Sequence, residues 1–289
     1  MEAQSKATSS TAAIFGEMTY VRPTFADKSW NFVAVQFGYI DMNFHGVPIL
    51  RFLVSRALWA TRLSSLLTVT TPMGYKLRFY PSSVSALMWC NPRFFERDEK
   101  VLTKHLRPND VFVDVGANIG TLSLTASKIV GPSGKVFSIE AHPTTVAYLR
   151  GNVQLNAAEN ISVIHAAAGD HEGSVKFSSG RSDDQNRVAT SGIGVPLSTL
   201  DLLLPKVAIR LLKVDVEGFE LFVFRGAERV LERTQMIYFE SWEQHFRKYG
   251  YGTSEVLAFL RDRGFETGLP ENYISDRNEN LLAVRTHSR

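Results

Sequence analysis

Cysteine is almost absent from this sequence, since Cys90 is the only one among 289 residues. A single thiol forms no intramolecular disulfide and supplies no multi-cysteine metal site. The lack of disulfides suits a reducing compartment, and we interpret Cys90 as an inert buried thiol.

The sequence also lacks an uninterrupted apolar run of membrane-spanning length. The segment 47–69 is about long enough, but Arg51, Arg56 and Arg62 interrupt it. We predict an amphipathic helix there, and its apolar face could pack on the main domain, make peripheral contact with a membrane, or cover an acceptor. The first 20 residues are rich in Ser, Thr and Ala and show no secretory pattern, so we expect a disordered tail and a cytoplasmic protein.

A large excess of charge of one sign is missing as well, because 32 Lys and Arg face 29 Asp and Glu. A dedicated nucleic-acid binder is usually more basic, so we expect no nucleic-acid partner. The charge is nevertheless uneven: residues 1–110 carry 13 basic and 8 acidic side chains. We therefore predict a basic N-terminal extension at 21–110, containing a helix and short strands and suited to be an acceptor lid, before a domain at 111–289.

From residue 111 onward, short β-branched or aromatic runs alternate with helical patterns. This order is typical of a parallel sheet with helices on both faces. The predicted strands are 111–115, 135–140, 161–169, 173–180, 208–214, 236–240 and 278–285. The predicted helices are 118–130, 143–156, 219–233 and 253–265, and 181–194 is predicted to be a long loop.

Four acidic residues stand at or near the carboxyl ends of predicted strands: Asp114, Glu140, Asp215 and Glu240. Any one of them could simply cap a helix. In an open parallel sheet, however, these strand ends meet at the edge where ligands bind. Four carboxylates on one edge indicate a ligand with several hydroxyls or a positive charge.

The turn after the first strand of the domain lacks one glycine of the dinucleotide-binding motif. Its residues are Gly116, Ala117, Asn118, Ile119 and Gly120, so the middle glycine that admits a pyrophosphate is missing. Glu140 follows Gly120 by 20 residues, the interval at which an acid binds both ribose hydroxyls. An amino-acid tail near Asp114 and a ribose on Glu140 describe S-adenosylmethionine.

Several segments resemble the FkbM family of S-adenosylmethionine-dependent methyltransferases. They are "FVDVGANIG", "IEAHP", "AAAGDHEGSVKF" and, most specifically, "LLKVDVEGFE". The resemblance runs from about residue 75 to 265. It implies an α/β class I methyltransferase fold, Rossmann-like, with a seven-stranded mostly parallel sheet and helices on both faces. The expected N-terminal helical and hairpin extension is additional, since the first 70 residues have no counterpart in the family. The resemblance also implies S-adenosylmethionine as cofactor and methylation of hydroxyl oxygens of sugars or natural products.

The resemblance and the positions of the acids and histidine near strand ends together give expected residues for two roles. The expected cofactor-binding residues are Glu96, Asp114, Gly116, Ala117, Asn118, Gly120, Glu140, Ala141, Ala168 and Asp215. The expected catalytic residues are Asp215, Glu217, Lys213, Glu240 and His245.

Asp215 is the preferred general base, because its strand ends nearest the expected methyl group. Glu217 and His245 remain alternatives, the latter because histidine titrates near neutrality. Lys213 either orients a carboxylate or extends to the surface. We expect Glu220 to form an ion pair at a helix start. No required metal is predicted, although a divalent ion bound by Asp215, Glu217 and Glu240 is an alternative because hard cations prefer oxygen ligands.

The leading functional hypothesis is methyl transfer to a hydroxyl of a glycan or small molecule. Methylation of nitrogen in a nucleobase or protein is an alternative, but "DVEG" stands where nucleobase enzymes carry an Asn/Asp-Pro-Pro-aromatic element. A catalytically silent cofactor-binding module is a third, disfavoured because the acidic element is intact.

Overall fold

The computed structural model describes residues 54, 57–58, 61, 64–177, 188–189, 192–269, 273–274 and 276–286. A central sheet is built from β3 (Val111–Val115), β4 (Lys135–Glu140), β5 (Ile161–His165), β10 (Ile209–Val214), β11 (Thr234–Ser241), β12 (Phe265–Gly268) and β13 (Glu279–Arg285). Their order is β12-β13-β11-β10-β3-β4-β5, and only β13 runs antiparallel to its neighbours. The expected seven-stranded, mostly parallel sheet is confirmed.

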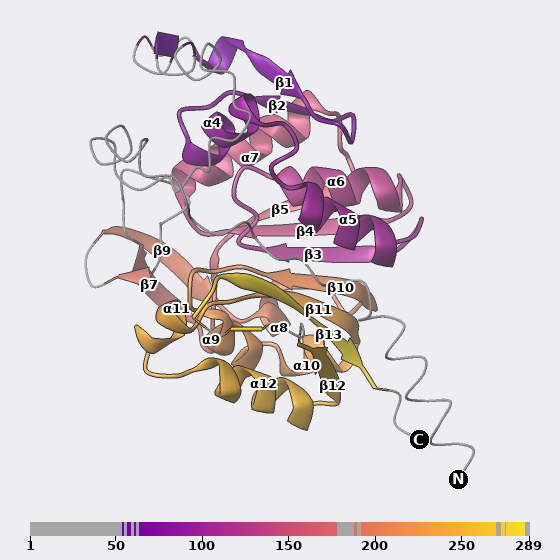
Figure 1. Cartoon of the computed structure of the whole chain (residues 1–289), viewed down its shortest axis with the longest axis vertical. Helices are drawn as coiled ribbons and strands as arrows, with labels where there is room; N and C mark the ends of the chain where they lie inside the picture. The colour runs from indigo at the N-terminus through magenta and orange to yellow at the C-terminus, as the bar shows by residue number, and fades with distance from the viewer. Residues whose placement is uncertain are drawn as a thin grey trace.

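Helices cover both faces of this sheet (Figure 1). One face carries α4 (Ser83–Cys90), α5 (Glu96–His105), α6 (Thr121–Val130) and α7 (Pro143–Leu155). The other carries α8 (Leu200–Leu203), α9 (Glu220–Arg225), α10 (Glu228–Glu232), α11 (Glu243–Arg247) and α12 (Thr253–Asp262). Successive strand residues point to opposite sides. Phe112 therefore joins the core cluster under α6, whereas Val113 joins the one under α9 and α12.

The connection between β5 and β10 reverses the direction in which the sheet grows. The chain passes outward from β3 to β4 and β5, and then returns to place β10 on the other side of β3. A parallel sheet has a crevice at such a reversal, at the carboxyl ends of the two adjacent strands. The fold thus places the ends of β3 and β10, with Asp114 and Asp215, at one ligand-binding edge.

The described part of the N-terminal extension packs against the main domain. It contains the 3-10 helix η2 (Ser64–Leu66) and the antiparallel strands β1 (Thr68–Thr70) and β2 (Lys76–Arg78). The backbone N–H groups of Lys76 and Arg78 donate to Asn156 Oδ1 at 2.8 Å and Asn152 Oδ1 at 2.9 Å. These hydrogen bonds attach the hairpin to α7.

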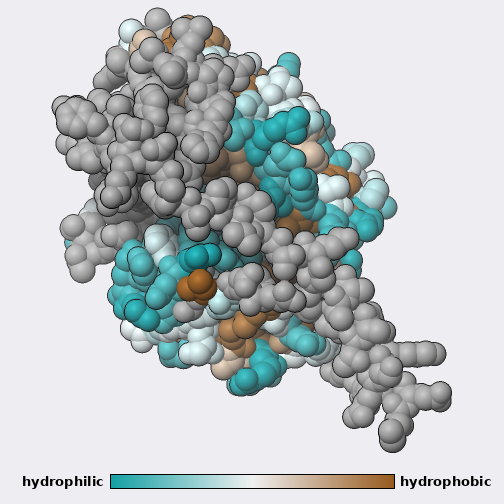
Figure 2. Space-filling view, in the orientation of Figure 1, coloured by the Kyte–Doolittle hydropathy of each residue, from teal (hydrophilic) through white to brown (hydrophobic). Residues whose placement is uncertain are grey.

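The predicted helix at 47–69 lies mostly outside the described residues, as do its three arginines and the tail 1–20. Its predicted end is wrong, because Thr68 and Val69 belong to β1, where Val69 pairs with Leu77. No helix within the described ranges combines the length and apolarity needed to cross a bilayer. Figure 2 shows mainly hydrophilic side chains on the described part of the face in view.

Some predicted elements are divided in the structure. The helix predicted at 219–233 is two helices, α9 and α10, separated at Gly226, where a Cβ would lie 1.9 Å from the carbonyl oxygen of Gly169. The strand predicted at 161–169 is β5 followed by β6 (Ala167–Ala168). The helix predicted to reach 265 ends at Asp262, and Phe265 begins β12.

The loop predicted at 181–194 is wrong where the structure describes it. It includes β8 (Val188–Ala189) and the start of β9 (Ile193–Ser198). With β6 and β7 (Gly173–Phe177), these strands form a second sheet in the order β6-β9-β7-β8. The glycine and proline within β9 conceal the alternation that would have indicated a strand.

Candidate functional site

The turn after β3 brings the backbone of the cofactor motif against the end of β10. Gly116 and Gly120 have φ angles of 78° and 93°, and Asn118 has a φ of 50°. A Cβ at Gly116 would lie 1.8 Å from the carbonyl oxygen of Asp215. Glycine is therefore required at 116, because any side chain would push the two strand ends apart.

Glu140 closes this turn from the end of β4. Its Oε2 accepts the N–H of Asn118 at 2.9 Å, and its Oε1 accepts the N–H of His142 at 2.8 Å. The side chain is buried, and burial raises its pKa from 4.5 to about 7 even though these backbone hydrogen bonds favour the ionised form. Each carboxylate oxygen retains a lone pair for a further donor.

Lys213 and Asp114 are register partners on β10 and β3. The Lys213 ammonium lies 3.4 Å from Asp114 Oδ1 and 3.3 Å from Asp215 Oδ2. Burial alone would lower the pKa of Lys213, but the carboxylates of Asp215 and Asp114 outweigh it and raise that pKa above its ordinary value. Ser123 Oγ donates to Asp114 Oδ2 at 2.6 Å, which fixes the orientation of the carboxylate.

Glu217, Glu240 and His245 meet at the ends of β10 and β11. His245 Nδ1 lies 3.3 Å from Glu217 Oε2 and 3.5 Å from Glu240 Oε2. Asn278 donates to the other oxygen of Glu240 at 2.7 Å. Burial, followed by the charge of Asp215, raises the pKa of Glu240.

Glu220 does not form the expected ion pair. It is fully buried, and its Oε1 accepts the N–H of Val216 at 2.9 Å and of Gly218 at 3.4 Å. The carboxylate thus caps the turn between β10 and α9. Burial, followed by the charge of Glu240, raises the pKa of Glu220 well above its ordinary value.

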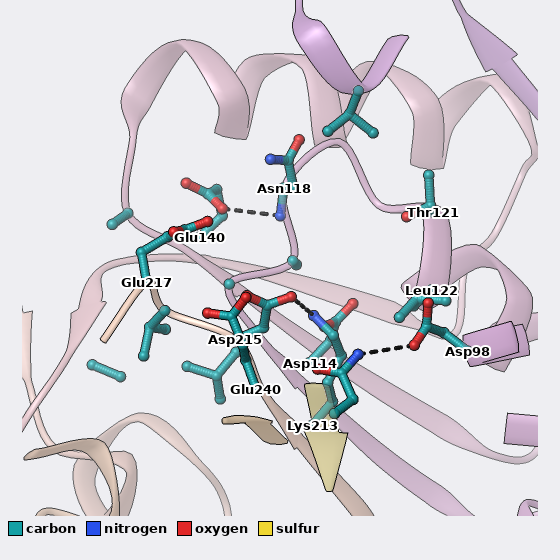
Figure 3. A pocket seen from close by; sticks show the side chains of 18 of the residues that line it. Asp98, Asp114, Asn118, Thr121, Leu122, Glu140, Lys213, Asp215, Glu217 and Glu240 are labelled. Carbon is teal, nitrogen blue, oxygen red and sulfur yellow. Dashed lines mark hydrogen bonds and ion pairs between the residues drawn. The ribbon is translucent and has the colours of Figure 1, made fainter. Parts of the chain in front are cut away.

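A cavity of about 270 Å³ opens between these groups. Figure 3 shows labelled side chains around it, with dashed lines joining Glu140 to Asn118 and Asp215 to Lys213. Of the expected site residues, those lining it are Asp114, Gly116, Ala117, Asn118, Glu140, Ala141, Ala168, Lys213, Asp215, Glu217 and Glu240. The strand-end pattern therefore predicts a set of side chains that the fold does bring together.

Three expected residues do not line the cavity. Glu96 is paired with Arg93 and Lys100 on the surface of α5. Gly120 lies in the turn itself and lets it pack closely on α7, because a Cβ at this position would lie 2.5 Å from Leu149 Cδ1. His245 contacts the cavity-lining carboxylates without reaching the cavity itself.

Asp98 is a cavity residue that sequence reasoning missed. It accepts hydrogen bonds from Tyr238 Oη at 2.7 Å and Asn280 Nδ2 at 3.0 Å. Asp98 is one of three acidic residues in the first turn of α5, with Glu96 and Glu99, and the sequence does not distinguish it from the other two. The partners that orient it come from β11 and β13, far away in sequence.

The lining fits a nucleoside with a charged tail. Glu140 retains acceptor capacity for hydroxyls, and Ala141, Ala168 and Phe177 supply apolar surface for a base. Asp114 Oδ1 is buried without a hydrogen bond, although the Lys213 ammonium is near. Glu140 would hold the ribose, and the Gly116 turn with Asp114 would hold the amino-acid end of S-adenosylmethionine.

This sheet order, with a crevice between β3 and β10, is that of the class I methyltransferase fold. A model of the methyltransferase FkbM domain matches residues 114–267, which is more than half of the sequence. The chain belongs to the FkbM methyltransferase family, whose methyl donor is S-adenosylmethionine.

The individual proteins that the chain resembles match it at low sequence identity or over a short segment. The hexuronic acid methyltransferase AglP of Haloferax volcanii is 27% identical over 175 residues, which is 58% of this chain and 71% of that protein. A probable cobalt-precorrin-6B C(15)-methyltransferase of Sulfolobus acidocaldarius is 39% identical over 57 residues, 20% of this chain and 30% of that protein. A crystal structure of methyltransferase FkbM from Methylobacillus flagellatus has a TM-score of 0.44 at 17% identity, covering 82% of this chain and 59% of that one.

Proposed function

We propose that this protein transfers the methyl group of S-adenosylmethionine to a hydroxyl oxygen of a sugar or another polyhydroxyl acceptor. The observation that carries the proposal is the cluster of carboxylates Asp98, Asp215, Glu217 and Glu240 on the lining of one cavity. Carboxylate oxygens accept hydrogen bonds, so this side of the cavity suits a molecule rich in hydroxyl donors.

The charge of the cavity favours an uncharged acceptor. Among the lining residues that the structure describes, Lys213 is the one Lys or Arg, and its ammonium is held by Asp114 and Asp215. The carboxylates would repel an anionic acceptor. A neutral sugar is therefore preferred over a uronic acid, even though one relative is named a hexuronic acid methyltransferase.

The chain's own residues position the acceptor and take up its proton. S-adenosylmethionine, when bound, supplies an electrophilic methyl group and keeps the carbon–sulfur electron pair as it becomes a neutral thioether. The Asp215 carboxylate accepts the hydroxyl proton. A general base in this role raises the rate of the reaction by about 10² to 10⁴-fold. Lys213 acts on Asp215 as a positioning residue, from 3.3 Å.

The test is a comparison of glycans and metabolites from cells with and without the protein, followed by transfer of a labelled methyl group in vitro. We expect products heavier by one methylene, with the methyl carbon bonded to oxygen. The in vitro acceptors should include neutral glycosides and the matching uronic acids. Methylation at nitrogen, or a clear preference for the uronic acids, would contradict the proposal.

A further inference from the structure

The side chains of Glu217, Glu240 and His245 form a compact group of metal-ligand type beside the cavity. One potential ligand atom from each lies within 4.8 Å of the other two. Glu240 and His245 are buried, with 7% and 6% of their surface exposed, and Glu217 is partly buried. His245 Nδ1 lies 3.3 Å from Glu217 Oε2 and 3.5 Å from Glu240 Oε2, within the about 4.0–4.4 Å that two ligand atoms span when each is about 2.0–2.2 Å from one cation.

Surrounding side chains fix two members of the group, Glu240 and His245. Asn278 holds Glu240 Oε1 at 2.7 Å, so Oε2 is the oxygen nearest His245. The His245 ring packs on Trp242, with ring centroids 4.0 Å apart. Glu217 has a φ of 57° in the turn after β10, an uncommon conformation for a residue with a side chain. Outer contacts of this kind orient metal ligands in known sites.

His245 supplies an observation independent of the acidic residues. Its Nδ1 is buried and makes no well-aligned hydrogen bond, although carboxylate oxygens lie 3.3 Å and 3.5 Å away. A protonated nitrogen placed so close would be expected to form an aligned hydrogen bond, and an unprotonated one directs its lone pair toward two anions. A cation shared by all three groups would satisfy the nitrogen and both carboxylates together.

Glu240 has no lysine or arginine partner among the described residues, where its ion pairs involve His245 alone. The nearby Lys213 ammonium is already engaged by Asp114 and Asp215. The Asp215 carboxylate adds further negative charge near Glu240, whose pKa it raises.

We infer that Glu217, Glu240 and His245 bind a divalent first-row transition-metal cation, for which Mn²⁺ is a suitable probe. Two carboxylates and an imidazole suit such a cation better than Ca²⁺ or Mg²⁺, which prefer oxygen ligands alone. Glu217 and Glu240 line the cavity, so the cation would border the acceptor position. The role of the cation rests on the proposed function: it would bind a hydroxyl of the acceptor and make that oxygen easier to deprotonate.

The experiment measures Mn²⁺ binding by the full chain after treatment with a chelator, with no acceptor present. Electron paramagnetic resonance reports free Mn²⁺, and calorimetry gives the stoichiometry. We expect one Mn²⁺ per chain, and about tenfold or more weaker binding in Glu240→Gln and His245→Ala. His171→Ala is the matched control, because His171 also pairs with a carboxylate, Asp170 at 2.6 Å, but on the surface.

Folding of the variants is checked by binding of S-adenosylhomocysteine, which uses other residues and should be retained. Absence of saturable Mn²⁺ binding by the unmodified chain would overturn the inference. Equal binding by the unmodified chain, Glu240→Gln and His245→Ala would also overturn it. If Mn²⁺ binds as expected but no hydroxyl is methylated, the metal site stands and the proposed function fails.

Discussion

Lys213 and Asp114 join the two strands that meet at the reversal of the sheet, with Nζ 3.4 Å from Oδ1. The side chains are only 7% and 1% exposed. Because the same ammonium also contacts Asp215, one buried positive charge connects β3 to the carboxylate that follows β10. Removal of Lys213 therefore leaves the Asp114 carboxylate buried without its ion-pair partner.

Lys213→Met is expected to destabilise the protein by about 3–5 kcal/mol, because it leaves the Asp114 carboxylate buried without its cationic partner. Urea denaturation measures the loss. Lys176→Met is the control: Lys176 is exposed on β7, so its loss should change stability by about 0.5 kcal/mol or less. Adding Asp114→Asn to Lys213→Met should recover part of the stability. No recovery in the double variant would argue against the ion pair as the cause.

Gly116→Ala is expected to abolish tight cofactor binding and to destabilise the fold. The added Cβ would lie 1.8 Å from the carbonyl oxygen of Asp215, and backbone cannot move aside cheaply. Gly250→Ala separates steric overlap from backbone strain, because Gly250 has a similar φ of 81° with nothing within 4 Å of its Cβ position. We expect about 1–2 kcal/mol of strain in Gly250→Ala and a clearly larger loss in Gly116→Ala. Thermal unfolding and calorimetry with S-adenosylhomocysteine measure both effects, and equal losses would contradict the close contact.

Glu140 should make cofactor binding depend on pH. Its pKa is raised to about 7, and ribose hydroxyls would donate to the ionised form. Affinity for S-adenosylhomocysteine should therefore rise by up to about tenfold per pH unit below 7 and level off above it. The free protein should show the opposite trend, because the stability from this group is complete below 4.5 and is lost as the pH rises through about 7.

Calorimetry across this pH range, with Glu140→Gln as the comparison, tests the assignment. The variant should bind more weakly and without the Glu140-dependent slope. A slope that survives in Glu140→Gln would assign the pH dependence to another group.

Asp215→Asn should lower the single-turnover rate by about 10² to 10⁴-fold while cofactor affinity changes little. Asparagine keeps the size of the side chain and an oxygen for Lys213, but it is not a base. Asp170→Asn, at a surface carboxylate paired with His171, serves as the control and should retain full activity. Full activity in Asp215→Asn would exclude the base role. Weaker cofactor binding with a small rate effect would instead make Asp215 a cofactor ligand.

The sequence predicts the sheet and most of the cavity lining because strand ends carry the acids. Asp114, Glu140, Asp215 and Glu240 line one cavity because the carboxyl ends of parallel strands meet at one edge. Asp98 could not be found in this way, since its position depends on Tyr238 and Asn280, which are more than 100 residues away.

The missed local features have similar causes. The break between α9 and α10 reflects the close approach of Gly226 to Gly169, a tertiary contact that a helical pattern does not reveal. β9 escaped notice because Gly194 and Pro196 lie within it, and local propensity disfavours both in a strand. The capping of the turn by Glu220 depends on its complete burial, which sequence alone does not specify.

The position of β13 in the sequence determines when the cavity can be completed during synthesis. β13 follows all the other sheet strands in sequence, yet it pairs between β11 and β12, and its Asn280 and the adjacent Asn278 hold Asp98 and Glu240. A ribosome releases the chain from its N-terminal end. During synthesis, the Gly116 turn and Glu140 therefore emerge long before the acidic side of the cavity receives its asparagine partners. A nascent chain can assemble its nucleoside pocket first, and it acquires a complete acceptor side only after Asn280 has left the ribosomal tunnel.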